Sequence, residues 1–158
     1  MPKISYSVTS KNRIGGFNKT IEVDSDKSIS IRAFLIGSIS QGVSEIKNAL
    51  ESEDVFSAID CLKRLGVKTK RIRKKNYIVY GKGLGSLSAK KNAVLNCGNS
   101  GTLARLLVGI LSTTPNINLK ITGDKSLRKR EMSQLINLMN KFGANFQYGF
   151  CFGFLFFP

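Results

Sequence analysis

The chain has 158 residues, of which 42% are hydrophobic and 22% are charged, so it is long enough for one hydrophobic core but not for two of full size. Its 25 lysine and arginine residues against 10 aspartate and glutamate residues give a net charge of +15, which predicts a surface that attracts anions. The absence of histidine excludes Ser-His-Asp and Cys-His catalytic arrangements. Any catalysis must therefore use lysine, arginine, aspartate or glutamate.

The hydrophobic pattern predicts the order strand, helix, strand, helix, strand, strand. The alternation of Ile4, Tyr6 and Val8 indicates a short strand ahead of this unit, and the segment lacks the apolar stretch of a secretory signal. The unit itself comprises a strand at 18–24, a helix from Lys27 to Ile39 capped by Ser25 or Asp26, a strand at 43–49, a helix at 53–65 ended by Gly66, and strands at 67–73 and 76–81.

The same order begins again after the glycine-rich stretch G-K-G-L-G-S-L. The second copy comprises a strand at 93–97, helices at 101–112 and 131–142 on either side of a strand at 117–122, and a strand that opens at 144–148. We therefore predict a mixed α/β (α+β) fold built from a repeated β-α-β-α-β-β unit, of which about one and two-thirds copies are present.

The helix predicted at 101–112 is apolar nearly all round, which indicates that it is buried on most sides. Arg105 is its one charge, and an arginine in such a helix needs an anion or a carboxylate nearby. Two alternatives stay open for Arg105: it reaches the surface from the first turn, or it pairs with an acidic residue.

Three segments combine a small or polar turn, a helix start and nearby cations, which is how proteins bind anions. In the first, Lys27 and Ser28 begin a helix and Arg32 follows on roughly the same face. In the second, N-C-G-N-S-G-T-L-A-R, two glycines allow close approach of a ligand and Arg105 lies one turn inside the helix. The third, T-G-D-K-S-L-R-K-R, ends at Arg130 directly before a helix.

Acidic residues form a fourth and weaker segment, L-E-S-E-D-V, in which we expect Glu51, Glu53 and Asp54 to serve as helix caps and dipole partners. The cysteines Cys61 and Cys97, with Cys151, are odd in number and widely spaced without a C-x-x-C pair. They indicate neither a disulfide framework nor a zinc site, and we interpret them as small buried apolar residues of a reducing compartment. No apolar run approaches the roughly 20 residues that span a bilayer, so we expect a cytoplasmic protein with no membrane contact.

In chain order the motifs are D-K-S-I-S-x-R, L-E-S-E-D-V, L-x-x-L-G-V, G-x-G, C-G-N-S-G-T-x-x-R-L-L-x-G-I-L and T-G-D-x-S-L-R-K-R-x-M. Together they resemble the enolpyruvyl transferase family, and within it the 5-enolpyruvylshikimate-3-phosphate synthases, over residues 18–148. A related transferase, which acts on UDP-N-acetylglucosamine, stays open as an alternative, although it has Lys-Asn where this chain has Lys27 and Ser28.

The resemblance implies an inside-out α/β barrel type of fold, in which β-α-β-α-β-β units surround buried helices, and this chain would be an incomplete first domain. It implies transfer of the enolpyruvyl group of phosphoenolpyruvate to the 5-hydroxyl of shikimate 3-phosphate, with release of phosphate and with no metal or organic cofactor. Residues matching Lys27, Ser28 and Arg32 bind shikimate 3-phosphate in the family, and Lys27 also touches phosphoenolpyruvate. Those matching Gly101 and Arg130 contact phosphoenolpyruvate, with Asn99 and Arg105 adjoining. The complete enzyme would be a monomer whose partners are these small molecules.

Several positions depart from the family pattern. Asp24 and Ser25 stand where Pro-Gly is usual, Ile31 replaces His or Asn, and Glu131 replaces a Pro. Two of these changes, Asp24 and Glu131, bring a negative charge next to an expected anion site. Glu131 keeps a favourable sign for the dipole of the helix that follows.

By resemblance, residues 1–25 are crossover strands that join the second domain, residues 26–148 are a partial N-terminal domain, and the second domain, with its acidic general base, is absent. Residues 149–158 form a phenylalanine-rich tail without helical or strand polarity. We interpret this tail as the result of truncation or a frameshift, with a genuine aromatic strand as the alternative.

Two other functional classes stay open. The net charge and the basic run at 63–75 are typical of a small nucleic-acid-binding module, although scarce aromatic residues near the run favour a solvated hairpin. Alternatively, the chain is a non-catalytic remnant of the transferase, and we expect it to be inactive alone.

Overall fold

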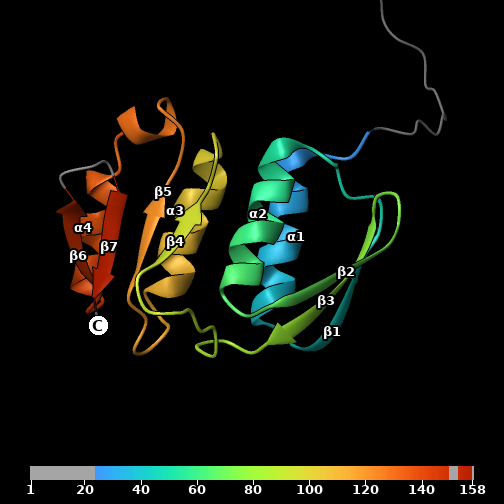
Figure 1. The fold of residues 1–158 in the computed structure, drawn as a ribbon, viewed down its shortest axis with the longest axis horizontal. Coiled ribbons are helices and arrows are strands. Elements are labelled where there is room, and N and C mark those ends of the chain that lie inside the picture. Colours follow the sequence, from blue (N-terminus) through green and yellow to red (C-terminus); the bar gives the residue numbers. More distant parts are fainter. Residues whose placement is uncertain (1–23, 150–152, 158) are drawn as a thin grey trace, which may run out of the picture.

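The computed structural model describes residues 24–149 and 153–157 (Figure 1). The strands expected at 4–8 and 18–24, and with them the crossover segment 1–25 apart from Asp24 and Ser25, lie outside this range. Cys151 also lies outside it. Within the described part, no helix is long and apolar enough to cross a membrane.

The first unit contains α1 (Lys27–Ile39), β1 (Gln41–Ile46), α2 (Glu53–Arg64), β2 (Lys68–Arg73) and β3 (Asn76–Lys82). Its three strands pair antiparallel in the order β1-β3-β2. The helices and the β2–β3 hairpin agree with the sequence prediction. The strand predicted at 43–49 begins two residues earlier, because Gln41 and Gly42 pair with Lys82 and Gly81 and so extend the ladder beyond the apolar pattern.

The second unit contains β4 (Ala93–Asn96), α3 (Gly101–Leu111), β5 (Leu119–Thr122), a 3₁₀ turn η1 (Leu127–Lys129), α4 (Ser133–Lys141), β6 (Asn145–Gly149) and β7 (Gly153–Phe157). Its sheet has the order β4-β5-β7-β6, in which β4 and β5 are parallel and the other pairs are antiparallel.

The two units share one plan. In the first sheet, β3 lies between β1 and β2, and in the second, β7 lies between β5 and β6, with antiparallel pairing in every case. This correspondence and the α-β order confirm the predicted repeat and the mixed α/β class. Residues 153–157 form the last strand of the second unit, in agreement with the alternative that this tail contains an aromatic strand. An all-apolar strand carries no period-two alternation, which is why the pattern missed it.

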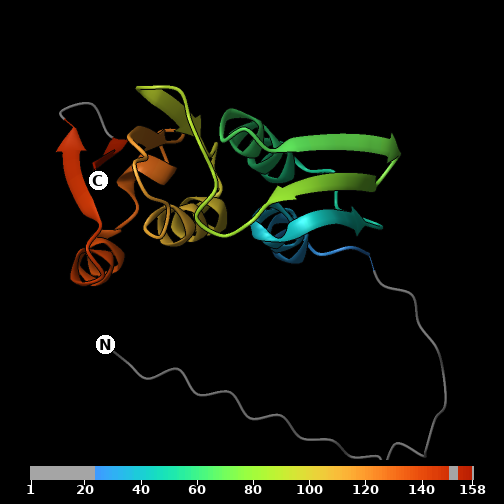
Figure 2. The same ribbon diagram turned by 90° about the horizontal axis from the view of Figure 1, so that it is seen from below.

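The helices α1, α2 and α3 pack side by side in the middle of the molecule, with the first sheet on one side and β5–β7 on the other (Figures 1 and 2). The largest fully buried side chains come from both units: Phe34, Ile31, Leu35, Val55, Leu62, Leu65, Val79, Leu95, Leu103, Leu107, Leu111 and Leu119. The helix α3 buries one side, which carries Leu103, Leu107 and Leu111, while its other side is partly buried and Arg105 is exposed, so the described residues cover less of α3 than its all-apolar sequence predicts. This core fixes the three helix axes and hence the places where the helices begin.

A close backbone contact joins α1 to the first sheet. A Cβ added at Gly81 of β3 would meet the Ser40 carbonyl oxygen and lie 2.5 Å from that of Gly37. Neither carbonyl can move without displacing the C-terminal end of α1. Glycine is therefore required at 81 for the helix to lie flat on the sheet.

Candidate anion-binding site

Helices α1, α2 and α3 all begin at the same end of the molecule (Figure 1). Asp26 caps α1, because its Oδ1 accepts a hydrogen bond of 2.7 Å from the N–H of Ile29. Ser100 caps α3 in the same way, with 3.3 Å from its Oγ to the nitrogen of Leu103. Of the two predicted caps of α1, Asp26 is the one observed. Together the helix starts give this end a positive potential from unpaired N–H groups and helix dipoles.

Lys27 stands at the first position of α1 and forms an ion pair with α2. Its Nζ lies 2.9 Å from Oδ2 of Asp54, and half of the lysine side chain remains exposed. Ser28 is half-buried beside it, and Arg32 is exposed one turn further along α1. The structure therefore keeps the predicted group on one helix and adds Asp54 as a partner that the sequence did not predict.

The acidic segment does not act as the expected set of caps. Ser52 is the N-cap residue of α2 and makes no capping bond through its side chain, while Asp54 pairs with Lys27. Glu51 faces the β2–β3 hairpin instead. Glu53 and Asp54 do lie in the first turn of α2, where their charge has the favourable sign for the dipole.

Two arginine side chains converge on the start of α3. A Cβ added at Gly101 would lie 2.7 Å from Nη1 of Arg130 and 2.8 Å from Nη1 of Arg105. Arg105 is exposed, as the surface-reaching alternative predicts, and its Nη2 donates to the backbone oxygen of Glu131 at 3.3 Å. Motifs that are separate in the sequence thus bring two guanidinium groups together beside a helix N-terminus, an arrangement suited to a carboxylate or a phosphate.

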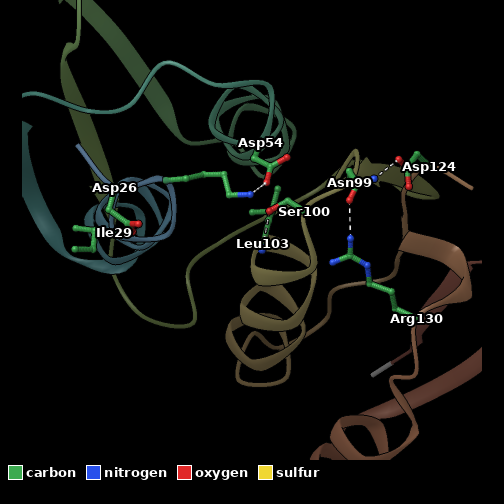
Figure 3. Close-up of polar contacts among 9 residues, drawn as sticks. Asp26, Ile29, Asp54, Asn99, Ser100, Leu103, Asp124 and Arg130 are labelled. Atoms are coloured by element: carbon green, nitrogen blue, oxygen red, sulfur yellow. Dashed lines mark hydrogen bonds and ion pairs between the residues drawn. The ribbon is translucent and has the colours of Figure 1, made fainter. Parts of the chain in front are cut away.

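Asn99 connects Arg130 to Asp124 (Figure 3). Nη2 of Arg130 lies 2.6 Å from Oδ1 of Asn99, and Nδ2 of Asn99 lies 2.7 Å from Oδ2 of Asp124. The other oxygen of Asp124 accepts from the N–H of Leu127 at 2.7 Å. These bonds lower the pKa of Asp124, the bond from Leu127 most of all, so its carboxylate is held ionised.

Asp124 is the functional residue that the sequence prediction missed. It joins the β5–α4 loop to the loop before α3 twice, since its N–H also donates to the carbonyl oxygen of Gly98 at 2.8 Å. A signal was present, because aspartate is common at the start of a turn, where its carboxylate accepts hydrogen bonds from nearby backbone N–H groups. Gly98 itself has a φ of +56°, which favours glycine, and a Cβ there would lie 2.9 Å from Oγ of Ser57.

The departures from the family pattern have distinct structural outcomes. The carboxylate of Glu131 accepts from the N–H of Ser133 at 2.7 Å at the start of α4, which agrees with the predicted dipole sign. Hydrogen bonds from the side chain of Ser133 and then from its N–H lower the pKa of Glu131. Ile31 is fully buried in the core, and Asp24 is exposed. The Glu131 side chain is thus used as a helix cap.

The basic run at 63–75 lies at the end of α2 and on the β2–β3 hairpin. Arg71 is paired with Glu51 at 2.8 Å, and Nζ of Lys68 lies over the ring of Tyr80, 5.3 Å from its centre. Glu51 also accepts from the N–H of Lys75 and from the hydroxyl of Tyr77. Part of this positive charge is therefore used within the hairpin, which favours the interpretation of the basic run as a solvated structural hairpin.

Cys61 and Cys97 are free and buried, as predicted for small apolar residues. A hydrogen bond with Cys61 raises the pKa of Cys97, and burial adds to the effect, so its thiol is held neutral. Among residues 24–149 and 153–157, no group of three or more histidine, cysteine, aspartate or glutamate residues could hold a metal ion.

Comparison with known proteins places this arrangement in a family. The model of the family EPSP synthase (3-phosphoshikimate 1-carboxyvinyltransferase) matches residues 11–151. The chain belongs to this family. A 3-phosphoshikimate 1-carboxyvinyltransferase of Caldicellulosiruptor saccharolyticus is 45% identical over 128 residues, which are 81% of this chain and 29% of that protein. One of Syntrophomonas wolfei is 42% identical over 127 residues, 80% of this chain and 29% of that protein.

The structure of an EPSP synthase from Acinetobacter baumannii superposes with a TM-score of 0.76 at 31% identity, covering 86% of this chain and 31% of the other. The family and the fold class predicted from the sequence are thereby confirmed. The chain spans less than a third of the length of the EPSP synthases that it matches.

Proposed function

We propose that this chain is the N-terminal portion of a 3-phosphoshikimate 1-carboxyvinyltransferase and supplies one wall of its active site. The reaction is the transfer of the enolpyruvyl group of phosphoenolpyruvate to the 5-hydroxyl of shikimate 3-phosphate, with release of phosphate. Support comes from the family to which the chain belongs and from the activity after which its relatives are named.

The convergence of Arg105 and Arg130 on Gly101 is the observation that carries this proposal. Phosphoenolpyruvate has a carboxylate and a phosphate, and guanidinium groups bind both through paired N–H donors. We assign Gly101 and Arg130 to phosphoenolpyruvate, with Asn99 and Arg105 adjoining. Because residue 101 has no side chain, an anion can approach the N-terminus of α3 and both arginines at once.

The start of α1 is assigned to shikimate 3-phosphate through Lys27, Ser28 and Arg32. Lys27 also reaches toward phosphoenolpyruvate in this assignment, and its ion pair with Asp54 fixes the ammonium group between α1 and α2. The 5-hydroxyl adds to C2 of phosphoenolpyruvate, a tetrahedral intermediate forms, and phosphate leaves. Cations on this wall stabilise the negative charge of both substrates and of the departing phosphate.

A second domain is required for turnover in this proposal. The acidic general base and further cations belong to that domain, so the 158-residue chain alone has no transferase activity. The complete enzyme is a cytoplasmic monomer that acts on small molecules. Nucleic acid is not a partner, and the cations of the hairpin serve its stability.

Complementation of an aromatic auxotroph tests the function. One strain expresses this chain alone, and another expresses it joined to the part of the Caldicellulosiruptor saccharolyticus protein that follows the matched segment. Growth of the second strain only is expected. Growth of the first, or turnover by the purified chain, would contradict the inactive-fragment assignment.

Variants of the joined protein test the site. Arg130→Lys keeps the charge but loses the paired donors, so kcat/KM for phosphoenolpyruvate should fall by about tenfold or more. Arg64→Lys makes the same change at an exposed position at the end of α2 and should leave kcat/KM unchanged. If kcat/KM for phosphoenolpyruvate is the same in the two variants, Arg130 does not bind this substrate.

A further inference from the structure

Arg130 needs a fixed position to act with Arg105 at Gly101, yet it is exposed and lies directly after a three-residue helical turn. An arginine side chain in such a place loses considerable conformational entropy when it is held in one position. Its Nη2 is held by Oδ1 of Asn99 at 2.6 Å. The position of Arg130 therefore depends on the groups that hold Asn99.

Donor and acceptor chemistry fixes the orientation of the Asn99 amide. An ionised carboxylate can only accept hydrogen bonds and a guanidinium can only donate them. The amide nitrogen of Asn99 must therefore face Asp124, and its oxygen must face Arg130, as the distances of 2.7 and 2.6 Å record. With the opposite orientation, two donors would meet at Arg130 and two acceptors at Asp124.

Asp124 is itself anchored by the backbone on both sides. Its Oδ1 accepts from Leu127, its carbonyl oxygen accepts from the N–H of Arg128 at 3.0 Å, and its N–H donates to Gly98. The adjacent Gly123 has no space for a side chain, since a Cβ there would meet Leu127 and lie 2.5 Å from the oxygen of Gly98. The carboxylate is thus rigidly placed relative to both loops.

We propose that Asp124 is a positioning residue, which orients the amide of Asn99 so that the amide oxygen holds the Arg130 guanidinium beside Gly101. This inference rests on the proposed function for its purpose, which is to arrange the phosphoenolpyruvate wall. Asp124 itself does not touch a substrate. Its effect on the orientation of Arg130 passes through Asn99, and its charge also attracts the guanidinium directly.

The isosteric change Asp124→Asn breaks this arrangement without altering side-chain size. A carboxamide at 124 can accept either from Leu127 or from Asn99 and must present its own donors to the other. Either the loop loses its cap or the Asn99 amide turns over and presents its NH₂ to Arg130. The second case releases the guanidinium directly, and the first frees the loop that holds residue 124 against Asn99.

Arginine side-chain NMR of the full chain measures this directly. The Arg130 Nη2–H signal, assigned by its disappearance in Arg130→Lys, should show slow solvent exchange in the parent protein, because Nη2 donates to Asn99. In Asp124→Asn, the solvent-exchange rate of this proton should rise to that of an exposed, unrestrained arginine. The control Asp60→Asn removes the same charge from an exposed position of α2 and should leave the signal unchanged.

A reciprocal exchange separates orientation from general loop damage. In the double variant Asn99→Asp with Asp124→Asn, the carboxylate at 99 accepts from both neighbours and the amide at 124 accepts from Leu127, so every donor again meets an acceptor. The Arg130 signal should regain slow exchange. An unchanged signal in Asp124→Asn, or a failure of the exchange to restore it while the backbone amide spectrum stays native, would overturn the proposal.

A second single variant covers the case in which Asp124→Asn does not fold. Asn99→Ala removes the bridge but leaves the bond between Asp124 and Leu127, and it should release Arg130 equally. A fixed Arg130 in this variant refutes the role of Asn99 and with it the proposal.

Affinity for inorganic phosphate, measured by titration of the full chain, distinguishes this inference from the proposed function. We expect a loss of about threefold to tenfold in Asp124→Asn and none in Asp60→Asn. Release of Arg130 without any loss of phosphate affinity supports the positioning role and counts against the anion site. If Arg130 stays fixed in Asp124→Asn and the parent chain binds phosphate, the anion site is supported and the positioning role is refuted.

Discussion

The two repeat units have the same strand order but use their loop carboxylates differently. In the first unit, Glu51 lies in the connection 47–52 between β1 and α2, and it bonds to Arg71, Lys75 and Tyr77 of the unit's own hairpin. In the second, Asp124 lies in the longer connection 123–132 between β5 and α4, which contains η1 and reaches back to the loop before α3.

This difference separates stability from function within one repeated plan. The first unit uses its carboxylate to hold the strand hairpin to the connection that precedes α2, which strengthens the unit itself. In our proposal the second uses it to arrange Asn99 and Arg130 beside Gly101, where the absence of a side chain leaves room for the Arg105 and Arg130 guanidinium groups. A glycine-to-alanine substitution should therefore lower stability in the first unit and anion affinity in the second.

Gly81→Ala in the first unit should have the largest effect. The new methyl group would meet backbone carbonyls of the α1 end, which cannot yield as a side chain can, so the free energy of unfolding should fall by about 3 kcal/mol or the chain should not fold. Urea unfolding followed by circular dichroism measures it. A loss below about 1 kcal/mol would show that α1 can move away from β3.

Gly101→Ala in the second unit should leave stability within about 0.5 kcal/mol of the parent, because the methyl group meets only the flexible ends of Arg105 and Arg130. Those ends must move apart, so phosphate affinity should fall by about tenfold. Titration with phosphate and urea unfolding on the same samples check both parts. Unchanged phosphate affinity would contradict the placement of the anion.

The sequence was sufficient to predict the helices, because each carries apolar residues at helical spacing and because α1 and α3 begin at the capping residues Asp26 and Ser100. The starts of α1, α2 and α3 agree with prediction. The helix predicted at 131–142 begins later, at Ser133, because Met132 takes the N-cap position and the carboxylate of Glu131 caps the first turn. Local sequence features thus determine where most of the helices begin.

The site could be predicted only in pieces. Gly101, Arg105 and Arg130 were each identified from their own loops, but their convergence depends on the parallel pairing of β4 with β5, which no local pattern contains. The roles of Glu51 and Asp124 could not be predicted, because their partners Tyr77 and Asn99 lie 26 and 25 residues away along the chain. The charged groups that organise each unit therefore needed the tertiary structure.

Alkaline pH should weaken the first unit's network specifically. Burial raises the pKa of Tyr77 to about 12, and its hydrogen bond to Glu51 adds to the effect. The folded state therefore keeps the Tyr77 proton above pH 10, where the unfolded chain releases it, and the stability from this group is lost as pH rises from about 10 to 12. Unfolding midpoints in urea across this range measure the slope.

The slope due to Tyr77 should be absent in Tyr77→Phe and retained in Tyr80→Phe, which removes a hydroxyl from the neighbouring part of β3. Lysine titration is common to all three proteins and cancels in the comparison. An equal slope in Tyr77→Phe and the parent would mean that the hydroxyl bond to Glu51 does not contribute to stability.

Gly109→Ala should have the smallest effect, and the opposite sign. In the described part of the chain, a Cβ at 109 meets nothing within 4 Å, so alanine should stabilise α3 by about 0.5–1 kcal/mol through backbone entropy alone. Phosphate affinity should stay unchanged, which separates a better helix from the anion site at Gly101 of the same helix. If the substitution instead destabilises the joined protein while stabilising this chain, the segment that follows must pack on α3 at that glycine.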